Sequence, residues 1–431
     1  MIALIPALLL AGAAQAAAAE PVVVYTAKAG DNLYTLGARY FDRMSDVATV
    51  QRLNRIANPY RIPVGTRIRI PHAVLRQSAV PAKVAAFSGP VSIGAPGKLA
   101  PAVLGMTVNE ADRIETGERG HATLRLADGS LVSIPSQSAV QIARMRQTAL
   151  IGSVDRLFTL SGGGLRARVT PMTNGESRFR VSTPTAVAAV RGTMFATSYD
   201  PATQATLTGV TEGKVELTDA ASHRMLALPT GFGAHAGDEA PHPLLAAPEL
   251  VDGGRIQNQP RLAFAVKPEA GANGYALSIA RDAGFIDVLD EARSATPEAS
   301  FDSLPTGTYF VRAAVIDASG IEGMASTYGF QRRLNSLSAS VEGSGKGRRR
   351  EYLFRWTGLG DGAHQYRFQL STHADGSQPM IDRIGLTGDR LIVTDLPVGD
   401  YYWRVMSVQF ADGQANGAWA ATETLHIEAR D

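Results

Sequence analysis

The chain has 431 residues, a formal net charge of +2 and no cysteine. Without cysteine it can form no disulfide, thiolate metal site or cysteine nucleophile, so its folding must rest on hydrophobic cores alone. The near-neutral charge argues against nucleic acid as a main partner, because no large basic face is needed to account for it. At about 100 to 200 residues per domain, this length predicts roughly two to four domains.

Residues 1–19 are typical of a secretory signal peptide. An apolar run, Ile2 to Leu10, precedes a small-residue stretch that contains Ala14-Gln15-Ala16 as a candidate cleavage signal. No later segment reaches about 18 uninterrupted apolar residues, so we expect no membrane span in the mature chain. The interpretation is an exported protein, periplasmic or otherwise associated with the cell wall.

Residues 22–71 have the pattern of a small strand, helix, helix, strand unit. The first strand, 22–26, ends at Gly30, which permits a sharp turn, and Asp31, which can cap a helix. Apolar residues at three- and four-residue spacing predict a helix that ends at about Phe41. A second helix, with Ser45 as a possible N-cap, must stop before Pro59, and alternating residues at 67–70 predict the last strand.

This order of elements, together with its turn residues, resembles the LysM (lysin motif) family. The resemblance is carried by Gly30-Asp31-Asn32-Leu33 at the first turn and by Asn58, Ile62, Pro63, Gly65 and Ile70 before and in the last strand. It implies recognition of N-acetylglucosamine-containing glycans, usually peptidoglycan, in a shallow groove between the loops 30–33 and 58–63. The alternative is that several of these residues serve turns and caps only, but jointly they favour a binding groove.

Short loops can offer backbone N–H and C=O groups to the acetamido and hydroxyl groups of a sugar. Three apolar side chains, Leu33, Tyr60 and Ile62, are expected to contact sugar faces. The expected glycan-binding residues are Gly30, Asp31, Asn32, Leu33, Asn58, Pro59, Tyr60, Ile62 and Pro63.

Residues 72–82 have little pattern and are expected to be a linker. Across residues 83–237, short alternating runs are separated by turn signals such as Asp128-Gly129, without convincing helices, which predicts an all-β domain. This domain is similar to the FecR family. The similarity is carried by Asp112 to Gly117, Ala122 to Ser130, Thr183 to Phe195 and Glu212 to Val215.

In the FecR family, some members relay iron-transport signals across a membrane to an anti-sigma activity, and many others are exported proteins of unassigned role. The relay needs a cytoplasmic head and a transmembrane helix, whereas this sequence has a signal peptide and a glycan-binding module. Arg191 is a possible partner contact. We favour the alternative, a tight turn in which Gly192 takes a positive φ.

Beyond Pro248 the chain repeats itself. Leu304 to Arg312 matches Leu396 to Arg404, and Tyr275 to Ile279 matches Tyr366 to Leu370. The repeat predicts two tandem β-sandwiches, 248–335 and 336–431, which resemble fibronectin type III and related immunoglobulin-like modules. The aromatic residues expected in their cores, rather than as sugar-stacking platforms, are Tyr309, Tyr401, Trp356, Trp403 and Trp419.

The expected fold is multidomain and mainly β, with a small βααβ LysM module, an all-β FecR-like domain and two tandem β-sandwiches. The eight histidines form no ligand-like pair, and no nucleophile, phosphate or dinucleotide motif is present. We therefore predict no metal, no cofactor and no enzymatic activity, although carboxylates paired only by folding stay possible. The leading hypothesis is an exported envelope protein that is tethered to peptidoglycan and whose β-domains scaffold or sense other envelope components, such as envelope proteins. The alternative is a signalling component, in which the FecR-like domain receives a ligand or partner and passes that state to another protein.

Overall fold

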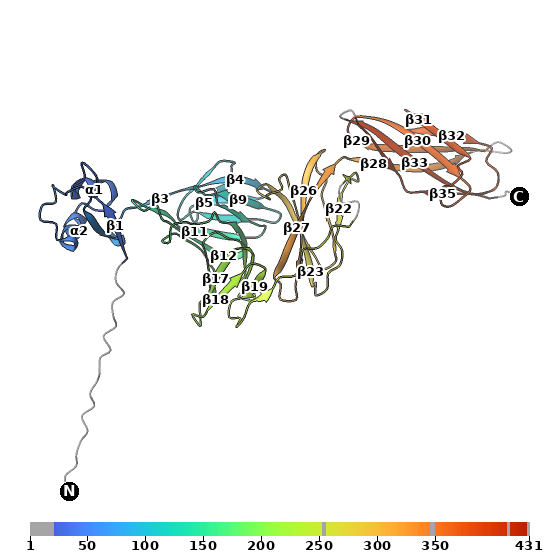
Figure 1. The fold of residues 1–431 in the computed structure, drawn as a ribbon. Coiled ribbons are helices and arrows are strands. Elements are labelled where there is room, and N and C mark those ends of the chain that lie inside the picture. Colours follow the sequence, from blue (N-terminus) through green and yellow to red (C-terminus); the bar gives the residue numbers. More distant parts are fainter. Residues whose placement is uncertain (1–20, 252–255, 345–349, 412–413, 429–431) are drawn as a thin grey trace, which may run out of the picture. The chain divides into compact units, whose positions relative to one another are not determined.

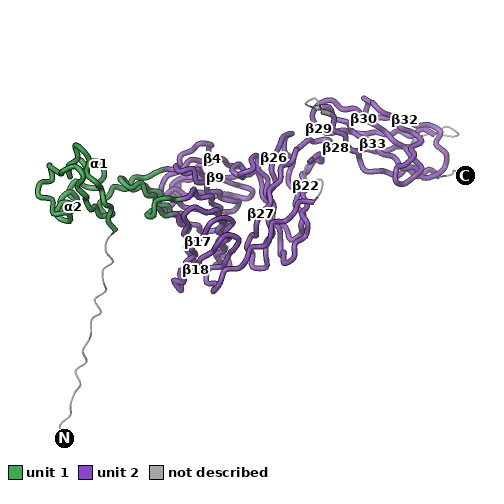
Figure 2. Tube along the Cα trace, viewed as in Figure 1, with its two compact units in different colours: residues 1–80, 144–156, 172–178 green, residues 81–143, 157–171, 179–431 purple. Residues whose placement is uncertain are grey.

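The computed structural model describes residues 21–251, 256–344, 350–411 and 414–428 (Figure 1). The expected signal peptide, residues 1–19, lies outside the described residues. The chain divides into two compact units (Figure 2). The first contains residues up to 80 with the segments 144–156 and 172–178, and the second contains the remainder.

The first unit begins with the βααβ module. Its elements are β1 (Val22–Thr26), α1 (Leu33–Tyr40), α2 (Asp46–Asn54) and β2 (Arg67–Pro71). Strands β1 and β2 pair antiparallel, from Val22 opposite Pro71 to Thr26 opposite Arg67. The helices pack on this two-stranded sheet around a core that includes Leu33, Leu36, Val47, Val50, Ile68 and Ile70.

Asn32, rather than the expected Asp31, caps helix α1. Its side-chain oxygen accepts the backbone N–H groups of Tyr34 and Thr35, both at 2.9 Å, and the Thr35 hydroxyl accepts the N–H of Asn32. This reciprocal pair satisfies helix donors that would otherwise lack partners. Ser45 occupies the N-cap of α2 as expected but makes no side-chain capping bond.

The segment expected to be a linker, 72–82, carries structure of its own. It holds a 3₁₀ turn, His72–Val74, and the strand β3 (Gln77–Ala79), which pairs with the end of β11 (Ala139–Thr148). At the tip of the β11–β12 hairpin, Leu150 and Ile151 pack against the core of the βααβ module. Local pattern could not predict this, because the partner strand is about 70 residues away in the sequence.

The FecR-like region is all-β, as predicted, and its pairings are antiparallel. One sheet, here the β12 sheet, has the order β7-β4-β9-β10-β12-β15-β16-β19-β20. Strands β13, β14, β17 and β18 pair in a second group, and β6, β5, β8 and β11 in a third. The strands are β4 (Ala82–Ser88), β5 (Val91–Gly94), β6 (Ala100–Pro101), β7 (Thr107–Val108), β8 (Arg113–Thr116), β9 (His121–Arg125), β10 (Leu131–Ile134), β12 (Val154–Arg168), β13 (Arg178–Ser182), β14 (Ala186–Val190), β15 (Met194–Asp200), β16 (Ala205–Glu212), β17 (Lys214–Asp219), β18 (Met225–Pro229), β19 (Phe232–His235) and β20 (His242–Pro243).

Two β-sandwiches follow, as the repeat predicts. In the first, a sheet of order β21-β27-β26-β23-β24 packs against the two-stranded sheet β22-β25. Its strands are β21 (Ile256–Gln257), β22 (Leu262–Ala265), β23 (Gly274–Ala280), β24 (Val288–Ser294), β25 (Glu298–Phe301), β26 (Gly307–Ile316) and β27 (Glu322–Arg332). In the second, the sheet β28-β29-β32 packs against a sheet of order β31-β30-β33-β34, in which β35 also pairs with β33. Its strands are β28 (Asn335–Ser344), β29 (Glu351–Gly360), β30 (Ala363–Ser371), β31 (Ile381–Leu386), β32 (Arg390–Thr394), β33 (Gly399–Ala411), β34 (Gln414–Trp419) and β35 (Glu423–Ile427).

Matching tyrosines mark the repeat in three dimensions. The Tyr309 hydroxyl donates to the carbonyl of Pro305 at 3.1 Å, and the Tyr401 hydroxyl donates to that of Pro397 at 2.9 Å. Four of the five aromatic residues expected in the cores are buried; the exception is Trp419, which is exposed beneath a stacked Arg404. The prediction for Trp419 is wrong, because its ring lies outside the sandwich core and contacts the side chain of Arg404 at the surface.

Candidate functional site

The two loops expected to form a groove lie against each other in the βααβ module. The backbone N–H of Leu33 donates to the carbonyl of Pro59 at 2.8 Å, which joins the first turn to the loop before β2. The Leu33 side chain is fully buried in the module core. The expectation that this side chain contacts a sugar face is therefore wrong, since its surface is already covered by protein.

The carboxylate of Asp31 has partners within the module. It accepts the Tyr25 hydroxyl at 2.6 Å and the Lys28 backbone N–H at 2.8 Å, and only 6% of its side chain is exposed. The Tyr25 hydrogen bond is the main cause that lowers the pKa of Asp31, and the same bond raises the pKa of Tyr25 to about 12. Asp31 thus ties the turn to β1.

The other polar residues of the two loops also bond their own backbone. The Asn32 side chain caps α1, and the Asn58 side-chain oxygen accepts the N–H of Tyr60 at 3.0 Å. Gly30 has a φ of +86°, a backbone conformation that residues other than glycine rarely adopt. The Pro63 carbonyl accepts hydrogen bonds from both the backbone N–H and the hydroxyl of Thr66. Side chains that hold the loops in shape leave exposed backbone and aromatic groups to meet a ligand.

An exposed aromatic pair lies across the two loops. The rings of Tyr34 and Tyr60 stack with centroids 4.6 Å apart and an interplanar angle of 22°. Tyr60 is 66% exposed and Tyr34 is 37% exposed, whereas Pro59 and Ile62 beside them are half-buried. Hydrogen bonding to Tyr60 raises the pKa of Tyr34. Such rings combine an apolar face with a polar hydroxyl, which suits contact with a sugar.

Tyr34 was missed in the sequence interpretation. It follows Leu33 directly, in the first turn of α1, and is not among the glycan-binding residues predicted from the sequence. The signal that could have found it is the presence of one aromatic residue at each of the two expected loops, Tyr34 and Tyr60. Their 26-residue separation is bridged only once the Leu33–Pro59 hydrogen bond brings the loops together.

Arg191, the possible partner contact, lies in the second unit. It is exposed at the turn between β14 and β15, beside Gly192 with a φ of +103°. A side chain added at Gly192 would approach Pro171 to 2.6 Å, so glycine is required there for both conformation and space. This geometry agrees with the tight-turn interpretation of the segment.

Within the described part of the chain, no group of three or more His, Asp or Glu side chains is arranged to hold a metal ion. A helix both long and apolar enough to cross a membrane is likewise not found among those residues.

Comparison with family models finds two matches. Residues 25–71 match the LysM domain, and residues 112–216 match the FecR protein family. Both predicted resemblances are confirmed. LysM domains bind N-acetylglucosamine-containing glycans such as peptidoglycan, so the LysM match suggests glycan binding by residues 25–71, and the FecR match suggests a signalling role. The comparison with curated proteins found no match.

Solved structures that this chain matches include a candidate anti-sigma factor from Parabacteroides distasonis, at 21% identity and a TM-score of 0.24. That match covers 28% of this chain and 53% of the other, so the chain spans about half the length of that protein. A two-domain fibronectin type III segment of chicken tenascin matches at 14% identity and a TM-score of 0.20, covering 42% of this chain and 97% of that one. The FN1–FN3 domains of chicken CNTN1 match at 11% identity and a TM-score of 0.21, covering 70% and 94%.

Proposed function

We propose that this is an exported, non-enzymatic protein of the cell envelope that binds peptidoglycan through its LysM module and presents its β-domains as a scaffold or sensor. The observation that carries the proposal is the exposed Tyr34–Tyr60 pair across the two loops. These rings form one apolar wall, while the backbone of residues 30–33 and 58–63 supplies polar groups for the acetamido and hydroxyl substituents.

The test is retention of the full chain on purified sacculi. Tyr60→Ala removes the more exposed ring, so we expect about tenfold weaker binding, the effect of losing about 1.4 kcal/mol of apolar contact. Tyr34→Ala should act in the same direction. Met44→Ala is the control, because Met44 is an exposed apolar residue of the same module outside both loops. Binding by the Tyr60 variant equal to that of the wild type would contradict the proposed surface.

A second candidate function, relay of a signal through the FecR-like domain, is favoured by one contact. Leu150 and Ile151, at the tip of the β11–β12 hairpin, pack against the core of the LysM module. The backbone N–H of Ala149 also donates to the carbonyl of Arg76 at 2.8 Å. A hairpin of the FecR-like region is therefore built into the glycan-binding module.

Hydrogen exchange with and without soluble peptidoglycan fragments tests this relay. The scaffold proposal expects protection confined to the two loops of the LysM module. The relay expects protection to extend to residues 144–156 and to β3, because these segments share hydrogen bonds and core contacts with the module. If the exchange rates of residues 144–156 do not change when the protein is saturated with peptidoglycan fragments, the result would argue against relay.

A further inference from the structure

The first β-sandwich lies against the β12 sheet of the FecR-like region, within the second unit. Strand β23 is buried along its whole length, because Tyr275, Leu277 and Ile279 face the sandwich core while Ala276 and Ser278 face the β12 sheet. A cavity of about 380 Å³ lies between these two faces, a size typical of small-molecule sites.

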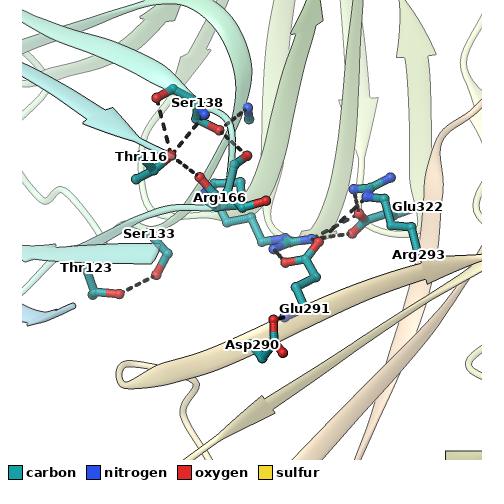
Figure 3. Close-up of polar contacts among 12 residues, drawn as sticks. Thr116, Thr123, Ser133, Ser138, Arg166, Asp290, Glu291, Arg293 and Glu322 are labelled. Atoms are coloured by element: carbon teal, nitrogen blue, oxygen red, sulfur yellow. Dashed lines mark hydrogen bonds and ion pairs between the residues drawn. The ribbon is translucent and has the colours of Figure 1, made fainter. Parts of the chain in front are cut away.

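Ion pairs cross from one face to the other beside this cavity (Figure 3). Arg166 of β12 donates to Glu291 of β24 at 2.9 and 3.2 Å and to Glu322 at the start of β27 at 2.9 and 3.0 Å. Arg293 also bonds Glu322. Two arginines and two glutamates therefore neutralise one another at this edge of the cavity.

Positive charge remains on the cavity wall. Besides Arg166 and Arg293, the arginines that line it are Arg168 and Arg312, and the one further carboxylate is that of Glu212. Arg312 makes no ion pair or hydrogen bond with any described side chain; its guanidinium lies 4.4 Å from the centre of the Phe285 ring. Burial, followed by the nearby charge of Arg166, lowers the pKa of Arg312 to about 10. An anion placed there would relieve both effects.

The second sandwich contains the same arginine with a partner. Arg404, the repeat equivalent of Arg312, stacks 4.3 Å from the centre of the Trp419 ring and donates to the Gln369 side-chain oxygen at 3.0 and 2.9 Å. Gln369 lies directly opposite Arg404 across the strand pair. In the first sandwich the residue directly opposite Arg312 is Ser278, which is shorter and makes no such bond. The change from glutamine to serine leaves the guanidinium without its partner and lines the cavity with a small side chain.

A second unpaired donor or acceptor lines the same cavity. His121 of β9 is 5% exposed, and its Nε2 atom has no hydrogen-bond partner among the residues that the structure describes. A buried polar atom left unpaired in this way is costly unless a ligand or water meets it. The remaining wall is largely apolar and includes Leu131, Leu207, Phe285 and Met324.

We propose that this cavity binds a small organic anion, a carboxylate carried on an apolar body, with Arg312 holding the carboxylate and His121 contributing a second polar contact. Arginine suits this role because its planar guanidinium donates two parallel hydrogen bonds to a carboxylate. The site is separate from the glycan-binding module and does not depend on the function proposed for it.

Calorimetric titration of the full chain tests the proposal, with hexanoate and benzoate as probes and hexanamide, benzamide and inorganic phosphate as comparisons. We expect at least one carboxylate to bind saturably and at least about tenfold more tightly than its amide. Equal affinity for the amide, equal affinity for phosphate, or no saturable carboxylate binding would overturn the assignment.

Three variants locate the site. Arg312→Gln should weaken carboxylate binding at least about tenfold, and Ser278→Gln should do the same by giving Arg312 the partner that Gln369 gives Arg404. Arg404→Gln is the matched control and should bind as the wild type does. Should Arg312→Gln fail to fold, Ser278→Gln alone decides, since it keeps the arginine. Carboxylate binding unaffected by Ser278→Gln would place the ligand elsewhere and refute the site.

Discussion

The hydroxyl of Tyr25 on β1 donates a 2.6 Å hydrogen bond to the carboxylate of Asp31, which also accepts the backbone N–H of Lys28. Both side chains are nearly buried, so the bond is made to a charged group with little access to water. It fixes the turn before helix α1 to the sheet. The loop geometry therefore depends on a residue outside the loop.

Tyr25→Phe should destabilise the LysM module by about 1.5–3 kcal/mol, the usual contribution of a hydrogen bond to a charged group. The measurement is hydrogen exchange of the β1–β2 amides in the full chain. Tyr34→Phe is the control, because Tyr34 is an exposed tyrosine of the same module outside the Tyr25–Asp31 pair, and its β1–β2 amides should exchange as in the wild type. Equal exchange rates in the Tyr25 variant and the wild type would exclude this contribution.

The same pair predicts a pH dependence. The pKa of Asp31 is lowered by the Tyr25 hydrogen bond, so its contribution is present above the ordinary value of 3.8 and is lost as the pH falls below it. The pKa of Tyr25 is raised to about 12, so its contribution is present below 10 and is lost as the pH rises toward 12. The exchange difference between the wild type and Tyr25→Phe should therefore be largest between about pH 4 and 10. A difference that persists unchanged at pH 2.5 would contradict the assignment.

Much of the fold follows from local pattern, and the exceptions have a common cause. The helix limits and the turn at Gly30 were predictable because capping residues and spacing act within a few positions. Whether Asp31 or Asn32 caps α1 was not, because the choice depends on Tyr25, which withdraws the Asp31 carboxylate from the helix. The contact with Tyr25 therefore determines which of the two neighbouring residues, Asp31 or Asn32, caps the helix.

The candidate site shows the same limit. The two loops were identified by resemblance, but the Tyr34–Tyr60 pair depends on a backbone bond between segments far apart in the sequence. The uniformly buried β23 likewise has a sequence that fits a sandwich strand with one solvent face, and only the β12 sheet that covers Ser278 explains its burial. Sequence periodicity reports which face of a strand is apolar and does not report a polar face covered by another domain.

Gly37, inside helix α1, yields a prediction opposite to helix propensity. Replacing an interior glycine by alanine ordinarily stabilises a helix by about 1 kcal/mol. A Cβ atom at Gly37 would lie 2.7 Å from Cγ2 of Val47 on α2, and both residues are buried. Since the β-branched valine cannot rotate away, Gly37→Ala should destabilise the module by about 1–3 kcal/mol.

Amide exchange in the two helices measures this effect. The informative companion is Gly37→Ala in a Val47→Ala background, where the clashing methyl group is absent. Gly37→Ala should lower the stability of Val47→Ala by less than it lowers that of the wild type. A Gly37→Ala variant as stable as the wild type would mean that α1 and α2 are not packed at this distance.

Two arginines that join the FecR-like region to the first sandwich differ in exposure. The Arg166 side chain is 23% exposed and pairs with Glu291 and Glu322, whereas that of Arg119 is 52% exposed and pairs with Asp290 and Asp302. Arg166→Ala leaves the two poorly solvated carboxylates with Arg293 as their remaining partner and should cost up to about 3–5 kcal/mol at this interface. Arg119→Ala should cost less than Arg166→Ala, because Arg119 and its partner Asp302 are both more than half exposed. Hydrogen exchange of the β23 amides in the full chain compares the two variants. Similar acceleration in both would refute the proposal that the cost depends on the burial of the ion pair.

The interface should also weaken in acid. Burial opposes ionisation of Glu291 and Glu322, but the charge of Arg166 outweighs it and lowers the pKa of both carboxyl groups below the ordinary 4.5. Groups with lowered pKa values stabilise the paired state above 4.5, and this stabilisation is lost as the pH falls through the lowered values. Exchange of the β23 amides, corrected for intrinsic rates, should therefore accelerate below about pH 4.5 in the wild type. A double variant, Glu291→Gln/Glu322→Gln, lacks both of these titrating groups and should accelerate less than the wild type, although Asp290 and Asp302 remain beside Arg119. If it accelerates as much as the wild type does, another group governs the interface.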